Sequence, residues 1–120
     1  MTKLTEAQEE WLVALESGEY KQTRHNLRTD DTFCCLGVAC DLSGLGEWVM
    51  TPADPRYIYV AAEDGRASFN FLLPPVRVWL SLTQDEGDTL AYMNDNGKTF
   101  KEIAAYVREN ADTVFTQEEN

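Results

Sequence analysis

The sequence contains no apolar run long enough to cross a bilayer, and its first residues, MTKLTEAQEE, have no apolar signal-peptide core. We therefore expect no membrane partner and a cytoplasmic location. Cysteine is also scarce, since the chain has only three, all within residues 34–40. Secreted disulfide scaffolds carry an even number of cysteines spread along the chain, so we expect reduced thiols here.

Basic residues are few: the chain has 10 Lys and Arg against 21 Asp and Glu, which gives a net charge of −11. This charge repels a phosphate backbone, so binding of bulk nucleic acid is disfavoured. The chain has a single histidine, His25, and it has no nucleophile motif, Gly-rich phosphate loop or credible set of metal ligands. We expect no cofactor and no metal, and enzymes are the third-ranked class of function.

The length of 120 residues and the hydrophobic content of 43% fit a single domain, residues 1–120, with one core. The predicted fold class is α+β, with about five helices around a central buried helix and a small antiparallel β-hairpin or three-stranded sheet. The predicted elements are helices at 5–17, 33–42, 76–82, 88–93 and 99–110, strands at 56–62 and 66–71, a further strand at 48–50, and a frayed tail at 111–120.

The first and last of these helices have the clearest signals. Thr5 and Gln8, and later Thr99 and Glu102, have the spacing of a capping box at a helix start. Apolar residues then recur at helical intervals, which predicts core-facing stripes made of Trp11, Leu12 and Leu15 in the first helix and of Phe100, Ile103, Ala104 and Val107 in the last.

The stretch FCCLGVACDL, residues 33–42, is apolar on nearly every side when drawn as a helix. Such a pattern is typical of a buried helix. Asp31 or Thr32 would cap its start, and Ser43 and Gly44 would end it. We therefore expect residues 33–42 to form the central helix.

The cysteines of this stretch do not have the spacing of a zinc site, and His25 could supply at best a fourth ligand. On an apolar helix their pKa values should be raised, which disfavours a reactive thiol. We interpret Cys34, Cys35 and Cys40 as inert core residues, with Gly37 allowing another element to approach closely.

The residues NDNG, Asn94 to Gly97, lie between two predicted helices. A calcium loop is rejected, because aligning Gly97 with the loop glycine puts Tyr92 and Ile103 where acidic ligands belong. Two interpretations stay open: a helix C-cap followed by a turn, or Asn94 and Asp95 as polar groups that face a ligand.

The segment GEYKQTRHNLRTDD contains the only concentration of basic residues in this acidic chain. It is either a solvated connector or a binding patch for an anion, such as a phosphate-bearing small molecule or an acidic partner. In the second case an aromatic ring and an amide lie beside the basic groups. The candidate ligand-binding residues are Tyr20, Lys21, Gln22, Arg24 and Arg28, together with Asn94 and Asp95.

Four segments in order, SGEYKQTRHNLR, FCCLGVACDLSG, LPPVRVWLSL and LAYMNDNGKTFKEIAAYV, resemble a family of small, largely uncharacterised proteins of tailed bacteriophages and prophages. The resemblance covers most of residues 11–107, and FCCLGVACD and MNDNGKTFKEIA are its distinctive marks. It implies a setting, the cytoplasm of an infected bacterium, and no particular activity.

In that setting the leading hypothesis is a non-enzymatic accessory protein of the anti-defence or host-takeover type. It would bind and neutralise a host factor, with a host protein or a nucleotide-type small molecule as its partner. The alternative is an acidic protein that imitates nucleic acid and inhibits a host enzyme. A small nucleotide-processing enzyme ranks third. The sequence leaves the oligomeric state open, including a homo-oligomer with a pocket between subunits.

Overall fold

The structure is a computed structural model, which describes residues 3–50, 52 and 56–116. Within these residues it confirms a small α+β domain with six helices and two three-stranded sheets. The helices are α1 (Glu6–Ser17), α2 (Cys35–Ser43), α3 (Pro74–Leu80), α4 (Gln84–Asp95), α5 (Phe100–Glu109) and α6 (Ala111–Val114). The strands are β1 (Lys21–Gln22), β2 (Arg28–Thr29), β3 (Thr32–Phe33), β4 (Gly46–Met50), β5 (Tyr57–Ala61) and β6 (Ala67–Ser68).

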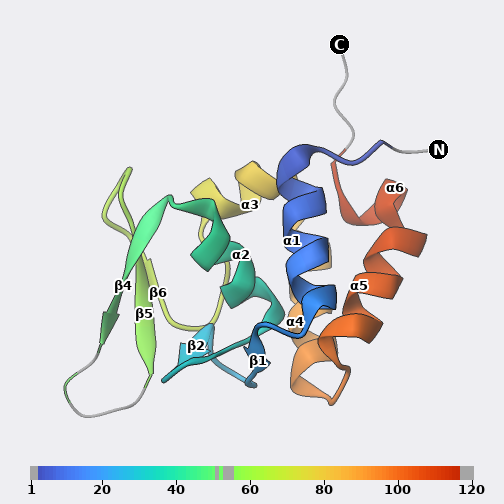
Figure 1. The fold of residues 1–120 in the computed structure, drawn as a ribbon. Helices are drawn as coiled ribbons and strands as arrows, with labels where there is room; N and C mark the ends of the chain where they lie inside the picture. Colours follow the sequence, from blue (N-terminus) through green and yellow to red (C-terminus); the bar gives the residue numbers. More distant parts are fainter. Residues whose placement is uncertain (1–2, 51, 53–55, 117–120) are drawn as a thin grey trace.

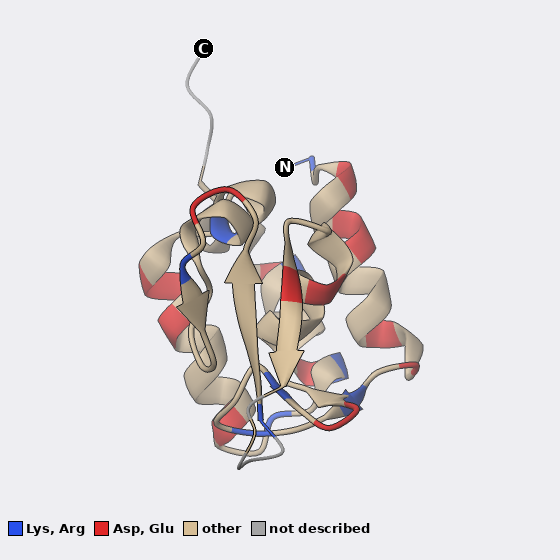
Figure 2. Ribbon diagram, turned by 90° about the vertical axis from the view of Figure 1, so that its left-hand side faces the viewer, with Lys and Arg blue, Asp and Glu red and all other residues tan. Residues whose placement is uncertain are grey.

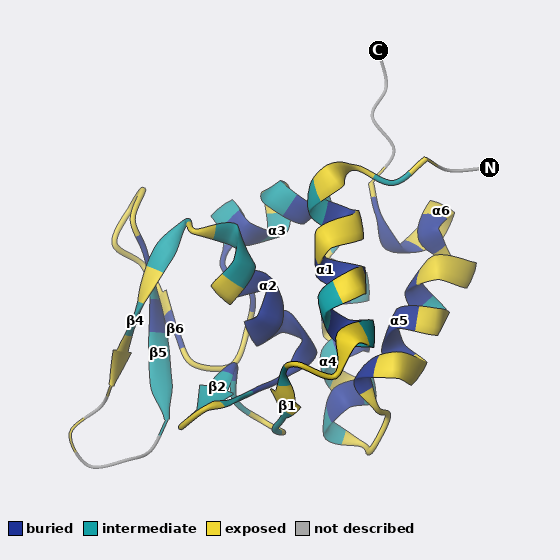
Figure 3. Ribbon diagram, in the orientation of Figure 1, coloured by how far each residue is buried: buried dark blue, intermediate teal, exposed yellow. Residues whose placement is uncertain are grey.

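Helix α2 is the centre of the fold, as predicted. It lies between the sheet β4–β5–β6 on one side and helices α1 and α4 on the other, while the small strands lie below it (Figure 1). Its residues Cys35–Cys40 are all buried and form the dark blue part of the helix in Figure 3, whereas Asp41 is exposed and Leu42 and Ser43 are half-buried. This burial follows from the apolar composition of residues 35–40, which have neighbours to pack against on every side.

The predicted start of this helix was wrong by two residues. Phe33 belongs to strand β3, and Cys34 is the N-cap, with its Sγ atom accepting a hydrogen bond from the Gly37 amide at 3.3 Å. Neither Asp31 nor Thr32 caps the helix. Phe33 belongs to the small sheet β1–β3–β2 because β3 is its middle strand, which pairs with β1 in parallel and with β2 in antiparallel orientation.

Gly37 has the close neighbour that the sequence led us to expect. A Cβ atom built at this position would lie 1.9 Å from the backbone oxygen of Leu27. Leu27 is fully buried, so the segment before α2 passes directly over the helix at this point. Only glycine fits such a contact between two backbones.

The larger sheet, β4–β5–β6, is antiparallel and confirms both the predicted hairpin and its third strand. Figure 2 shows it in front of the helices. β4 pairs with β5 so that Trp48 lies opposite Tyr59, and β5 turns into β6 through Gly65, which has a positive φ of 73°. β6 is shorter than predicted, because the chain leaves the sheet at Ser68.

Three predictions about the second half of the chain need correction. Helix α3 spans Pro74–Leu80 instead of 76–82, because Ser81 adopts a left-handed conformation that ends it. Helix α4 begins at Gln84 instead of residue 88, with the Thr83 hydroxyl capping the Glu86 amide. The tail was expected to fray from residue 111, yet Ala111–Val114 form α6, and Val114 is fully buried. Residues 117–120 of that tail lie outside the described residues.

No helix in the described part of the chain is long and apolar enough to span a membrane.

Candidate functional site

The predicted basic segment, residues 20–28, is held to the end of α4 by hydrogen bonds. Asn94 is fully buried; its Oδ1 accepts from Gln22 Nε2 at 2.9 Å and from the Cys35 amide at 3.2 Å. Its Nδ2 donates to the Thr23 carbonyl at 2.8 Å. Asp95 Oδ1 accepts from the His25 amide at 2.7 Å. The polar groups of Gln22, Asn94 and Asp95 therefore fix the path of the chain, and Asn94 has no surface with which to contact a ligand.

Arg28 is enclosed by aromatic rings. Its Cζ atom lies 3.9 Å from the ring centroid of Tyr57, 5.1 Å from that of Phe33 and 5.6 Å from that of Trp48. The side chain is only 18% exposed, and its Nε donates to the Asp30 carbonyl at 2.7 Å. Cation–π contacts of this kind stabilise the fold. They turn the charge of Arg28 toward the sheet and away from a ligand.

The remaining candidates do not converge on one cavity. The hydroxyl of Tyr20 donates to Asp41 Oδ2 at 2.7 Å; burial and this carboxylate raise the pKa of the tyrosine. Lys21 and Arg24 are exposed. Most of the predicted residues therefore support the strands β1–β3, and they do not line a common site.

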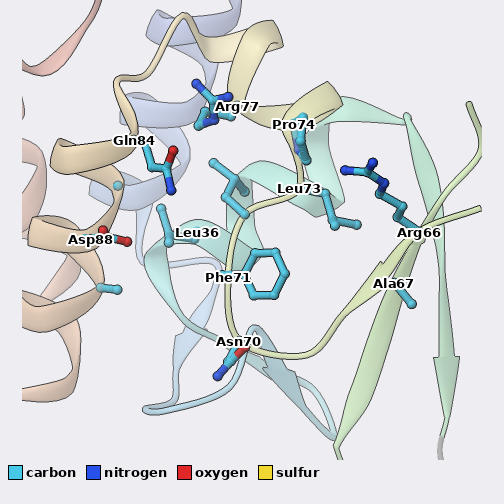
Figure 4. Close-up of a pocket in the computed structure, with 13 residues that line it drawn as sticks. Leu36, Arg66, Ala67, Asn70, Phe71, Leu73, Pro74, Arg77, Gln84 and Asp88 are labelled. Carbon is cyan, nitrogen blue, oxygen red and sulfur yellow. The ribbon is translucent and has the colours of Figure 1, made fainter. Parts of the chain in front are cut away.

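A pocket of about 520 Å³ lies elsewhere, on the side of α2 that faces α3, α4 and the loop between β6 and α3. Figure 4 shows this pocket with Phe71 near its middle, Gln84 and Asp88 on one side, and Arg66 and Ala67 on the other. The residues that line it are Leu36, Arg66, Ala67, Asn70, Phe71, Leu72, Leu73, Pro74, Arg77, Gln84, Gly87, Asp88 and Ala91.

The loop between β6 and α3 is fixed by Ser68. The Ser68 hydroxyl is buried and accepts hydrogen bonds from the amides of Asn70 at 3.3 Å and Phe71 at 3.0 Å. This turn lifts the Phe71 ring away from the core, so that it is 56% exposed, while Leu72 and Leu73 point inward and are buried. A large aromatic side chain held at the surface next to a pocket is typical of a ligand-binding position.

Two arginines contribute positive charge to the pocket. Arg77 lies in the last turn of α3, with its Nη1 3.5 Å from the Leu82 carbonyl oxygen. Arg66 follows the β5–β6 turn, with its Nε 3.7 Å from Asp64 Oδ2. The Arg66 side chain is 69% exposed, so an anion that binds in the pocket can reach the guanidinium from solvent. Arginine suits phosphate and carboxylate groups because its planar fork donates two parallel hydrogen bonds.

Helix α4 forms the opposite wall. Gln84, Gly87, Asp88 and Ala91 are spaced at 0, 3, 4 and 7, so they share one face of the helix. Gln84 and Asp88 are exposed and bring an amide and a carboxylate to the pocket, while Gly87 lies buried between them. The pocket thus combines an apolar floor with positive, negative and amide groups, which fits an amphipathic ligand carrying an anion and hydrogen-bond donors.

Sequence reasoning missed this pocket because its walls come from residues 36, 66–77 and 84–91, which only the folded chain brings together. One signal was present. Thr83 and Glu86 have the same spacing as Thr5 and Gln8, and this would have placed the start of α4 correctly.

The cysteines are buried free thiols, as predicted. Burial raises the pKa of Cys34 to about 11 and raises the pKa values of Cys35 and Cys40 well above the ordinary range. In the part of the chain that the structure describes, no group of three or more His, Cys, Asp or Glu side chains could hold a metal ion.

We expect the native protein to resist alkylation by iodoacetamide at pH 8, with three thiols reacting once the chain is unfolded in denaturant. In the unfolded chain the thiols have the ordinary cysteine pKa of about 8.5, so above that pH they lose their protons on unfolding. The free energy of unfolding should therefore fall as the pH rises toward the folded pKa values. Mass spectrometry counts the modified thiols. Labelling of the folded protein at the rate of a free cysteine would contradict this account.

These features define the class of protein: a small α+β domain with an arginine-bearing pocket beside its central helix. The chain belongs to the family described as Domain of unknown function (DUF8296), whose model matches residues 3–111. The comparisons with curated proteins and with solved structures gave no match. The family description specifies no activity, so the resemblance to tailed-phage proteins stays a prediction.

Proposed function

We propose that this protein is a non-enzymatic phage accessory protein that sequesters a nucleotide-like anionic small molecule and so neutralises a host factor in the bacterial cytoplasm. The observation that carries the proposal is the pocket of about 520 Å³, in which Arg66 and Arg77 flank the exposed ring of Phe71. We therefore propose this pocket, and not the basic segment at residues 20–28, as the binding site.

The size and chemistry of the pocket support a nucleotide-like ligand. Small-molecule sites usually enclose about 300–1,000 Å³, with apolar walls and a few polar groups that orient the ligand. The ring of Phe71 offers a stacking surface for a base, and base–aromatic stacking is a common source of affinity. The two arginines offer the charge-assisted hydrogen bonds that phosphate groups prefer.

The lining favours binding over turnover. Among the described residues that line the pocket there is one carboxylate, Asp88, and no His, Cys, Ser, Thr or Lys. Nucleophilic or acid–base catalysis needs such groups as activated pairs. The protein would then act by lowering the free concentration of its ligand.

The acidic-inhibitor alternative has less support. Figure 2 shows Asp and Glu on the helices on both sides of the sheet and on the hairpin turn, instead of on one face. On α1, Glu9 and Glu16 accept hydrogen bonds from Arg108 at 2.7 Å each, which neutralises part of that surface. An imitation of a phosphate backbone needs an unbroken row of negative charge.

Isothermal titration calorimetry against mono-, di- and triphosphates of the four nucleosides tests the proposal. We expect at least one nucleotide to bind. Arg77→Gln should weaken that binding by about tenfold or more, because a hydrogen bond to a charged group contributes about 1.5–3 kcal/mol.

The matched control is Arg24→Gln, which removes an exposed arginine from the basic segment and should leave the affinity unchanged. The reverse result, with Arg24→Gln abolishing binding and Arg77→Gln leaving it intact, would return the site to residues 20–28. Native mass spectrometry of the protein isolated from bacterial cells would then identify the ligand; a clean apo mass combined with no nucleotide binding would reject sequestration.

A further inference from the structure

The seven glycines of the chain differ in what the fold requires of them. Gly37 and Gly46 lie against a backbone oxygen, with built Cβ distances of 1.9 Å and 2.3 Å. Four others have positive φ angles, which L side chains rarely adopt: Gly18, Gly44, Gly65 and Gly97. Gly87 belongs to neither group.

Gly87 lies inside helix α4, where glycine is unfavourable because it loses more backbone freedom than alanine. Its φ is not in the left-handed region, and a Cβ atom there would meet only Leu82 Cδ2, at 3.6 Å, an ordinary contact. The described fold would therefore accept alanine and gain stability from it. Gly87 also lines the pocket, so the space above it is space available to a ligand.

We infer that Gly87 is a specificity-determining residue of the pocket, which leaves room for the base of a guanine nucleotide to lie against α4 and be recognised by Gln84 and Asp88. This inference rests on the proposed function and specifies its ligand. Gln84 and Asp88 lie on either side of Gly87 on the same helix face, and Figure 4 shows both on the side of the pocket opposite Arg66, with Phe71 between.

Hydrogen-bond chemistry favours guanine over adenine at this wall. The Asp88 carboxylate offers acceptors only, and guanine presents two adjacent donors, N1–H and the N2 amino group. The Gln84 amide can then donate to guanine O6. Adenine N1 is an acceptor, so its lone pair would face the carboxylate. The two acceptors repel each other and neither gains a hydrogen bond. The base would stack on Phe71, with its phosphates near the arginines.

The test compares GDP with ADP on the wild-type protein and on Gly87→Ala. We expect GDP to bind about tenfold or more tightly than ADP, since a good bidentate contact discriminates between bases by about that factor or more. Gly87→Ala should raise Tm by roughly 2–5 °C through helix propensity and weaken GDP binding by about tenfold. Asp88→Asn should remove most of the preference for GDP.

The matched control is Thr89→Ala on the exposed side of α4, outside the pocket lining, which should raise or preserve Tm and leave the affinity for GDP unchanged. Equal binding of GDP and ADP, or a Gly87→Ala protein with wild-type affinity, would overturn this inference while leaving the proposed function in place. Failure of every nucleotide to bind would overturn both.

Discussion

Gly37→Ala is expected to lower the free energy of unfolding by at least about 3 kcal/mol, the upper end of the usual cost of overpacking a core. The added methyl group would lie 1.9 Å from the oxygen and 2.8 Å from the carbonyl carbon of Leu27. Both are backbone atoms, so no side-chain rotation relieves the clash. Urea unfolding followed by circular dichroism measures the loss.

The backbone of Leu27 cannot move away without further loss. Its amide donates to the Phe69 carbonyl at 2.7 Å, and its own carbonyl accepts from the Cys34 amide at 3.0 Å. Displacing it would break two buried hydrogen bonds and separate the segment before α2 from the β6–α3 loop. Gly87→Ala provides the comparison, since it adds the same methyl group without a clash. A Gly37→Ala protein within about 1 kcal/mol of wild type would show that this contact is not rigid.

Asn94→Leu is expected to cost about 3–5 kcal/mol of unfolding free energy. The substitution keeps the approximate volume of a fully buried side chain but removes the hydrogen-bond partner of the Cys35 amide and of the Thr23 carbonyl. It also removes one of the two acceptors of Gln22 Nε2, which keeps the Lys98 carbonyl. Each buried group left without a partner costs about 1–3 kcal/mol. Hydrogen exchange should also become faster in residues 20–34, because Asn94 ties that segment to α4.

The control for this prediction is Asn96→Ala, two residues further along, at the C-cap of α4. Asn96 is exposed, and its Nδ2 donates only to the Tyr92 carbonyl of its own helix, at 2.8 Å. Its loss should stay below about 1 kcal/mol. Equal effects of the two substitutions would mean that Asn94 does not organise the basic segment.

Local signals predicted the local elements well. The capping boxes at Thr5 and Thr99 place α1 and α5 correctly, because the reciprocal side-chain bonds they specify form within one turn of helix. The apolar composition of residues 33–42 predicted a buried central helix. The close approach of another backbone segment at Gly37 followed from the absence of a side chain there.

Contacts between distant segments could not be predicted in the same way. The strands β1, β2 and β3 contain two residues each and exist through pairing and through the side chain of Asn94, some 60–70 residues away. The basic residues nearby therefore suggested a binding patch, whereas the packing uses Arg28 and Gln22 for support. The pocket depends on the turn that Ser68 makes, and a serine within a strand-like run gives no such indication.

The measurement that tests the central claim most directly is mapping of amide chemical shifts by NMR during titration with GDP. The account predicts saturable shifts concentrated in residues 66–77 and 84–91, with the Phe71 and Gly87 amides among the most affected, and no comparable change in residues 20–28. Shifts confined to residues 20–28, or no saturable shift with any nucleotide, would contradict it.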